Sequence, residues 1–186
     1  MVSRPIVGVL AIQGGFEAHV KILLELGADP REVRTTADLE GLDALIIPGG
    51  ESTVMSLGIE RERMADPLRD LIDRGTPVLG TCAGMIMLDR DHLGRLDVVC
   101  RRNAFGRQAH SFEADLQISS LDGAPVHAVF IRAPWIAERG PGVDVLADVD
   151  GHPVAVRQGK LLAVSFHPEL SGETRLHELL LSLISA

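Results

Sequence analysis

Apolar runs alternate with segments of helical periodicity in the first half of the chain. Ile6 to Leu10, Ala44 to Ile47 and Pro77 to Leu79 are uniformly apolar, as strands buried on both faces are. Strands that alternate with helices form βαβ units and a parallel sheet. The other elements expected here are a helix with Val20, Leu23 and Leu24 that ends at Gly27, a weak strand over Glu32 to Arg34, a helix over Pro67 to Arg74 and a helix from near Ala83.

From about Asp97 the pattern changes to short strand-like segments. Asp150-Gly151 and Gln158-Gly159 are typical of hairpin turns. A closing helix carries Leu176, Leu179, Leu180 and Leu183 on one face. The strands expected in this half are Asp97 to Cys100, Phe112 to Ile118, Val126 to Ile131, Val143 to Val149, Val154 to Arg157 and Leu161 to Phe166. The whole pattern predicts one α/β domain, with a parallel sheet, helices on both faces and added antiparallel strands.

Composition limits the classes of function. Of the 186 residues 46% are hydrophobic and 3% aromatic, so the core is expected to be mainly aliphatic. The net charge of -8 argues against nucleic acid as a partner, because phosphate binding needs clustered Lys and Arg. The N-terminus shows no apolar stretch of a signal peptide, and no run is long enough to span a membrane. We therefore expect a cytoplasmic protein with no membrane contact.

Cys82 stands in "GTCAGM", directly after an apolar run and before an expected helix. The pattern G-x-C-x-G is the thiol version of the nucleophile elbow, and the N-terminus of the following helix favours a thiolate. Two alternatives remain: a buried cysteine in a glycine-rich turn, or a disulfide with Cys100, which would need an oxidising compartment. Cys100, after Val98-Val99, is expected to be a buried, inert thiol.

The stretch "SFHPE" ends another apolar strand. His167 and Glu169 are two residues apart, so they share a face in extended chain, and Pro168 between them favours that geometry. Glu169 could therefore orient the imidazole, as the third member of a catalytic triad does. The alternative is a surface turn in which both side chains face water.

The stretch "PGGEST", Pro48 to Thr53, follows the strand Ala44 to Ile47. Its glycines let backbone N–H groups approach a ligand closely. The alternative is that Ser52 or Thr53 caps the next helix. Ligands bind at the carboxyl ends of parallel strands, where all three stretches are expected. Cysteine, histidine and glutamate together there suggest acyl transfer through a thioester.

"PGGEST", "GTCAGM" and "SFHPE" resemble the three signatures of class I (triad) glutamine amidotransferases. "GVLAIQG", "RNAFGRQ", "SFEADL" and "VFIRAP" resemble stretches of the glutaminase subunits of pyridoxal 5′-phosphate synthase, in vitamin B6 biosynthesis. The matches run from about Gly8 to Glu169. One departure is the segment between the elbow helix and Asp97, which is shorter than is usual in that family.

The resemblance implies a flavodoxin-like three-layer α/β/α fold, with a single glutaminase domain over residues 1–186. It implies hydrolysis of L-glutamine to glutamate and ammonia, with Cys82 as nucleophile, His167 as base and Glu169 as its orienter. It also implies transfer of the ammonia to a synthase (PdxS-type) subunit in a large hetero-oligomer, without a cofactor. The substrate contacts that it implies are Gly50, Glu51, Ser52, Arg102, Ile131 and Arg132.

Two rival functions stay open. One is a glutaminase of another pathway, such as histidine synthesis, against which "RNAFGRQ" and "FIRAP" argue. The other is a non-catalytic stress protein with an oxidisable elbow cysteine, which would not need "HPE". No metal site is expected, because the remaining histidines are scattered without ligand-like spacing. These are His19, His92, His110, His127, His152 and His177.

Overall fold

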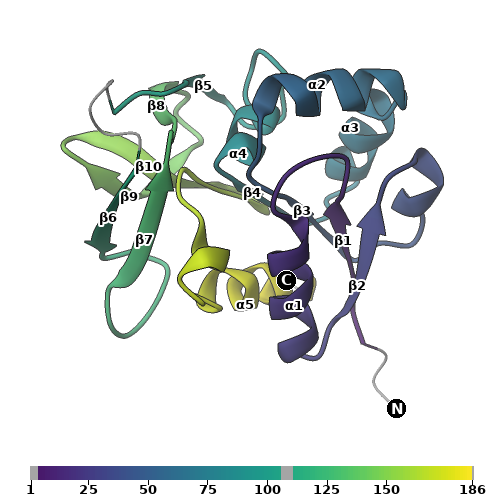
Figure 1. Ribbon diagram of the computed structural model, residues 1–186, viewed down its shortest axis with the longest axis horizontal. Coiled ribbons are helices and arrows are strands. Elements are labelled where there is room, and N and C mark those ends of the chain that lie inside the picture. The colour runs from purple at the N-terminus through teal and green to yellow at the C-terminus, as the bar shows by residue number, and fades with distance from the viewer. Residues whose placement is uncertain (1–3, 106–110, 186) are drawn as a thin grey trace.

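A computed structural model describes residues 4–105 and 111–185 (Figure 1). Its main sheet has seven strands in the order β2-β1-β3-β4-β11-β10-β9. The first five are parallel, and β10 and β9 continue the sheet antiparallel. The strands are β1 (Ile6–Leu10), β2 (Asp29–Val33), β3 (Ala44–Ile47), β4 (Val78–Thr81), β9 (Asp144–Val149), β10 (His152–Gln158) and β11 (Leu161–Val164). The predicted mainly parallel sheet with antiparallel additions is confirmed.

Helices cover both faces of this sheet (Figure 1). On one face lie α1 (Phe16–Glu25) and α5 (Arg175–Ser182), whose Leu23 and Leu180 pack in a cluster with Ile46 of β3. On the other face, Leu45 and Ile47 of β3 belong to a second cluster with the remaining helices. Those are α2 (Ser52–Arg61), α3 (Ala65–Asp73) and α4 (Ala83–Leu88). The three-layer α/β/α architecture is thus confirmed, and it explains why β3 is apolar on both sides.

Two small antiparallel sheets flank the main one. β5 (Val98–Arg101) pairs with β8 (Trp135–Arg139), and β6 (Ser111–Leu116) pairs with β7 (Val126–Ile131). β8 was not among the expected strands, since Ile136 is buried but the next three residues are exposed. The aromatic side chains of Phe105, Phe112, Phe130, Phe166 and Trp135 make edge and stacked contacts around β7.

Several local expectations were shifted. Leu24 of α1 was expected in the core but is 59% exposed, whereas Ile22 and Leu23 are buried. Successive residues of a helix point about 100° apart, so Leu24 lies beyond the buried face that Ile22 and Leu23 share. β2 ends at Val33 and begins earlier than expected. The predicted turn at Asp150-Gly151 is confirmed, with φ of 51° and 78° between β9 and β10. Two single-turn 3₁₀ helices, Thr36–Leu39 (η1) and Pro168–Leu170 (η2), complete the elements.

The short segment between α4 and β5 is organised by a buried carboxylate. Asp89 accepts hydrogen bonds from the backbone N–H groups of Asp91 at 3.0 Å and Cys100 at 3.2 Å. It also contacts Nδ1 of His92 at 2.7 Å. Charge-assisted bonds of this kind hold a compact turn without a long loop. Within the two described ranges, no helix is both long and apolar enough to cross a membrane.

Candidate active site

Cys82 occupies a strained turn between β4 and α4. Its backbone φ is 50° and ψ is -106°, a region that non-glycine residues rarely adopt. The Cys82 N–H donates to the carbonyl of Val164 at 2.8 Å, which ties the turn to β11. The residue is only 6% exposed, and Sγ lies 3.9 Å from the carbonyl oxygen of Ile131. Strain of this kind persists only where the surroundings enforce it, as at functional sites.

The glycines on either side of Cys82 are required by close packing. A Cβ on Gly84 would collide with the carbonyl oxygen of Ile47, and one on Gly80 would lie 2.7 Å from the backbone of Gly84. Any side chain at either position would therefore push α4 away from β3 and β4. The structure thus contains the predicted strand–cysteine–helix turn, with the spacing that the pattern G-x-C-x-G indicates.

His167 and Glu169 follow β11 and form a buried pair. Nδ1 of His167 lies 2.7 Å from Oε1 of Glu169, and their side chains are 13% and 2% exposed. The His167 N–H donates to the carbonyl of Val129 at 2.9 Å, which fixes this segment against β7. The alternative of a solvated surface turn is excluded by this burial.

The surroundings of the pair favour its ionised form. Burial lowers the pKa of His167, but hydrogen bonds to Cys82 and Glu169, together with their charges, outweigh it and raise the pKa to about 10. Burial raises the pKa of Glu169, yet the hydrogen bond from His167 and the neighbouring His19 lower it overall. At neutral pH these shifts favour an imidazolium next to a carboxylate.

The glycine-rich loop after β3 packs directly on these groups. A Cβ on Gly49 would collide with the ring of His167 and lie 3.3 Å from Cβ of Cys82. The Gly49 carbonyl accepts the Gly15 N–H at 3.0 Å, and Oε1 of Gln13 accepts the Glu51 N–H at 2.8 Å. The loops that follow β1 and β3 are therefore joined beside Cys82.

The alternative interpretation, in which Ser52 or Thr53 caps α2, is wrong. The helix starts at Ser52 with Glu51 at its cap, and no side chain makes a capping hydrogen bond. Instead, the guanidinium of Arg102 donates to the hydroxyl oxygens of Ser52 at 3.2 Å and Thr53 at 3.1 Å. The two hydroxyls thus hold an arginine at the edge of the site.

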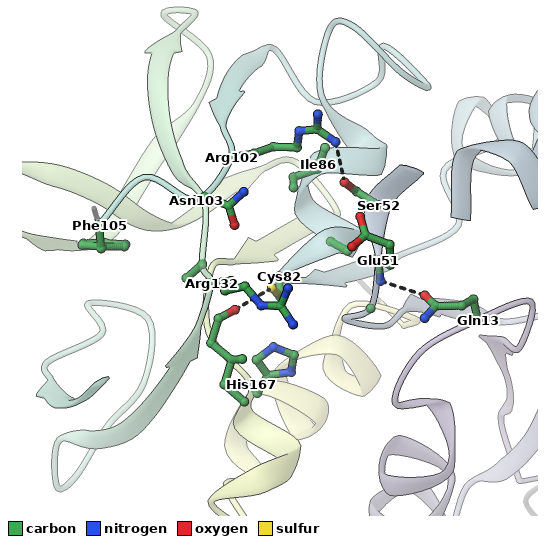
Figure 2. A pocket seen from close by; sticks show the side chains of 14 residues that line it. Gln13, Glu51, Ser52, Cys82, Ile86, Arg102, Asn103, Phe105, Arg132 and His167 are labelled. Atoms are coloured by element: carbon green, nitrogen blue, oxygen red, sulfur yellow. Dashed lines mark hydrogen bonds between the residues drawn. The ribbon is translucent and has the colours of Figure 1, made fainter. Parts of the chain in front are cut away.

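All these elements enclose a cavity of about 760 Å³, shown in Figure 2. Cys82 and His167 lie in its wall, and the guanidinium of Arg132 points into it. Each of the six expected substrate contacts lines it: Gly50, Glu51, Ser52, Arg102, Ile131 and Arg132. Arg132 is held at φ of 44°, a second strained residue at this site. A cavity whose wall combines apolar side chains with polar and charged groups suits a small polar ligand.

The expected substrate contacts did not include several residues that line the cavity. Gln13, Ile86, Asn103, Phe105 and Ala133 also line the cavity. Asn103 and Phe105 belong to "RNAFGRQ", so the motif itself was the available signal. Gly106 to Gln108 of that motif, and His110, lie outside the described residues.

Two histidines that the sequence treats as scattered meet behind the site. His19 of α1 and His177 of α5 are fully buried, with His19 Nδ1 and His177 Nε2 2.9 Å apart. Nε2 of His19 lies 3.5 Å from Oε2 of Glu169. No sequence signal joins residues 158 positions apart, because they meet only when α1 and α5 pack on the same face of the sheet. In the described part of the chain, no three His, Cys, Asp or Glu side chains are grouped to hold a metal ion.

The second cysteine lies apart from this chemistry. Both thiols are free, so the disulfide alternative is excluded. Burial, together with the carboxylate of Asp89, raises the pKa of Cys100 far above its usual range. Cys100 is only partly buried, so the expectation of a buried residue is wrong. A thiol that stays protonated is still a poor nucleophile, which agrees with the predicted inert role.

Comparison with known proteins adds the family. The model of the SNO glutamine amidotransferase family matches residues 9–185. A pyridoxal 5′-phosphate synthase subunit PdxT of Parafrankia sp. (strain EAN1pec) is 52% identical over 98% of this chain and 94% of its own. The PdxT of Mycolicibacterium vanbaalenii is 50% identical over 98% of this chain and 100% of its own. A crystal structure of a glutamine amidotransferase superposes with a TM-score of 0.91 at 46% identity, covering 97% of this chain and 99% of that one.

Proposed function

The chain belongs to the SNO glutamine amidotransferase family, and on that premise we propose how its cavity carries out the reaction. The protein is a glutaminase subunit of pyridoxal 5′-phosphate synthase: it hydrolyses glutamine and supplies ammonia for the synthesis of this vitamin B6 compound. We assign the chemistry to Cys82, His167 and Glu169. The observation that carries this assignment is the strained Cys82 in one cavity wall with the buried pair of His167 and Glu169.

The first half of the reaction forms a thioester. The Cys82 thiolate attacks the side-chain amide carbon of glutamine and forms a tetrahedral intermediate with a negatively charged oxygen. As the C–N bond breaks, the His167 imidazolium gives its proton to the departing nitrogen, which leaves as ammonia. The γ-glutamyl group stays on Sγ. Glu169 keeps the imidazole in the right orientation and stabilises its protonated form.

The second half releases glutamate. His167, now neutral, takes a proton from a water molecule, whose oxygen attacks the thioester carbon. The C–S bond breaks, the thiolate returns and His167 is again protonated. One histidine serves both steps because its proton leaves with ammonia and is replaced from water.

Backbone N–H groups would stabilise the developing oxyanion. Ala83 is the first residue of α4 and lines the cavity, and N–H groups in the first turn of a helix have no partner within the helix. The second donor would be a backbone N–H of the glycine-rich loop after β3, where Gly49 packs on Cys82 and His167. Loss of one such donor typically costs about 10²–10³ in rate.

The charged groups of the cavity match those of free glutamine. We assign the α-carboxylate to the guanidinium groups of Arg102 and Arg132, which line the cavity. A guanidinium can bind a carboxylate with two parallel hydrogen bonds. The Glu51 carboxylate is the counterpart of the α-ammonium group. Binding both ends of the amino acid directs the side-chain amide towards Cys82.

Arg132→Ala is expected to lower kcat/KM for glutamine by about 10- to 100-fold, mainly through KM, because one carboxylate contact is lost. Arg102→Ala is expected to act in the same direction, since it also frees the hydroxyls of Ser52 and Thr53. Steady-state ammonia release over a range of glutamine concentrations measures both constants.

Arg101→Ala is the matched control. Arg101 is the last residue of β5 and precedes Arg102, but its guanidinium lies over the ring of Trp135, and it is not among the residues that line the cavity. Its loss should leave KM unchanged. An unaltered kcat/KM in Arg132→Ala or Arg102→Ala would remove that arginine from the substrate site.

We further propose that this subunit works in a large hetero-oligomer and is activated by its synthase partner. Gln13 and Gly15, on the loop after β1, hold Glu51 and Gly49 of the glycine loop. Glycine peptides reorient at little cost, so contact at the β1 loop can be passed to the proposed oxyanion donor. The test is a glutaminase assay of the purified chain with and without a matching synthase subunit, in which we expect a rise of at least about tenfold.

Gln13→Ala is expected to reduce that activation more than it reduces the activity of the isolated chain. The substitution removes the acceptor of the Glu51 N–H and so uncouples the two loops. The measurement is the ratio of turnover with and without the synthase subunit. Gln117→Ala, which alters an exposed glutamine after β6, should keep the wild-type ratio. If the isolated wild-type chain is as fast as the mixture, activation by the partner is refuted.

A further inference from the structure

A row of buried titratable groups continues behind Glu169. Oε1 of Glu169 binds His167, but Oε2 is buried and makes no hydrogen bond to the described residues. His19 Nε2 lies 3.5 Å from this oxygen, and the hydroxyl of Thr81 lies 3.4 Å from the same nitrogen. A buried carboxylate oxygen without a hydrogen-bond partner destabilises the folded protein. A nearby group that can donate to it therefore contributes to stability.

The neighbours of the two rings constrain which nitrogen of each carries the proton. Burial lowers the pKa of His19 and lowers that of His177 to about 3, so both imidazoles are neutral. Each then has one N–H and one lone pair. If His19 carried its proton on Nδ1, its Nε2 lone pair would face the carboxylate. With the proton on Nε2, His19 donates to Glu169, and its Nδ1 accepts the Nε2–H of His177 at 2.9 Å.

We propose that His19 is a positioning residue for the glutaminase reaction: its Nε2–H binds Oε2 of Glu169, and His177 holds His19 in that tautomer. The inference rests on the roles assigned to His167 and Glu169 above. Its effect is on geometry and charge, because neither residue lines the cavity. Contacts of this kind are commonly long in a free enzyme and shorten as charge develops on the base.

The groups that face this row are few. His167 lies on the side of the cavity, followed by Cys82, which hydrogen bonds with it. On the far side, the backbone and the charge of Glu173 both act on His177 from the segment before α5. Between them, Glu169 faces His19 from α1 and His177 from α5. Within this set, His19 Nε2 is the group that can donate a hydrogen bond to Oε2 of Glu169.

Two substitutions of His19 separate the loss of its hydrogen-bond donor from the loss of its packing. The amide nitrogen of Gln can occupy the place of Nε2, so His19→Gln keeps a donor to Glu169. Asn reaches only as far as Nδ1, so His19→Asn leaves Oε2 unpaired. In the complex with the synthase subunit, His19→Asn should lose about 10- to 100-fold in kcat with KM within about twofold of wild type. His19→Gln should recover most of that activity.

The pH profile gives a readout that a merely structural role would not move. A thiolate–imidazolium pair gives a bell-shaped profile of kcat/KM. Without a donor at Oε2, the pKa of Glu169 rises and its carboxylate stabilises the imidazolium less. The pKa of His167 therefore falls. The bell of His19→Asn should therefore narrow by about one pH unit. His177→Phe should narrow the profile less, because His19 can still donate to Glu169.

Leu180→Ala is the control for lost packing. Leu180 is buried on α5 next to His177 but is apolar, so its variant should lower thermal stability and keep the limbs of the profile unshifted. If His19→Asn fails to fold, ¹⁵N NMR of wild-type histidines decides: the proposal requires His19 with its proton on Nε2. An Nδ1–H tautomer, or an unshifted profile in a folded His19→Asn, overturns it. Glu169→Gln tests the catalytic roles assigned above separately. Full activity in that variant would refute the role of Glu169 itself, whatever the result for His19.

Discussion

Cys82→Ala is expected to lower glutamine hydrolysis by roughly 10⁴-fold or more, because no other group can form the thioester. The fold should persist, since Cys82 is small and alanine can occupy the same turn under similar strain. Ammonia release in the presence of the synthase subunit measures the loss, and thermal unfolding measures the stability. Cys82→Ser should be nearly as inactive, because a hydroxyl is a far weaker nucleophile than a thiolate at neutral pH.

Cys100→Ala is the matched control for this prediction. Its thiol lies 4.0 Å from the carbonyl oxygen of Met85 and takes no part in the cavity lining. Activity close to wild type is expected. Activity near wild type in Cys82→Ala would instead remove Cys82 as nucleophile, and with it the thioester mechanism.

His167→Asn is expected to be almost as damaging as loss of the cysteine, because residues that act as one catalytic unit are not additive. Without the imidazole, nothing protonates the leaving nitrogen or activates water. Glu169→Gln should cost less, since it removes the charge that raises the pKa of His167 but leaves the base in place. Both variants are measured by kcat with the synthase subunit present.

The order of the two effects is the decisive observation. A larger loss in Glu169→Gln than in His167→Asn would mean that the two roles are misassigned. Glu173→Gln provides the control, because this carboxylate is close in sequence and also largely buried. It pairs with Arg175 at 2.6 Å and does not line the cavity. Its substitution should lower stability more than activity.

Single substitutions in the glycine loop illustrate how closely the site is packed. A methyl group on Gly49 would collide with His167, so even alanine there must displace a group assigned to the chemistry. The sequence marks this loop as glycine-rich, but the partner that forbids a side chain is visible only in the structure. Similarly, the sequence named Ser52 as a possible helix cap, whereas its hydroxyl accepts a bond from Arg102, 50 residues away.

The sequence by itself determined the strands that end at the site and the motifs that follow them. Apolar runs and glycine turns are local features, so β1, β3 and β7 were predicted with the bounds that the structure has. The same holds for the strand–cysteine–helix turn, whose glycines are set by contacts close to Cys82.

Only the tertiary structure decided how distant residues meet. His19 and His177 come together because α1 and α5 cover one face of the sheet, and this places them behind Glu169. The cavity likewise combines loops after β1, β3, β4 and β7. Local periodicity sets which face of an element is apolar, but the neighbour that covers this face depends on the packing of the whole chain.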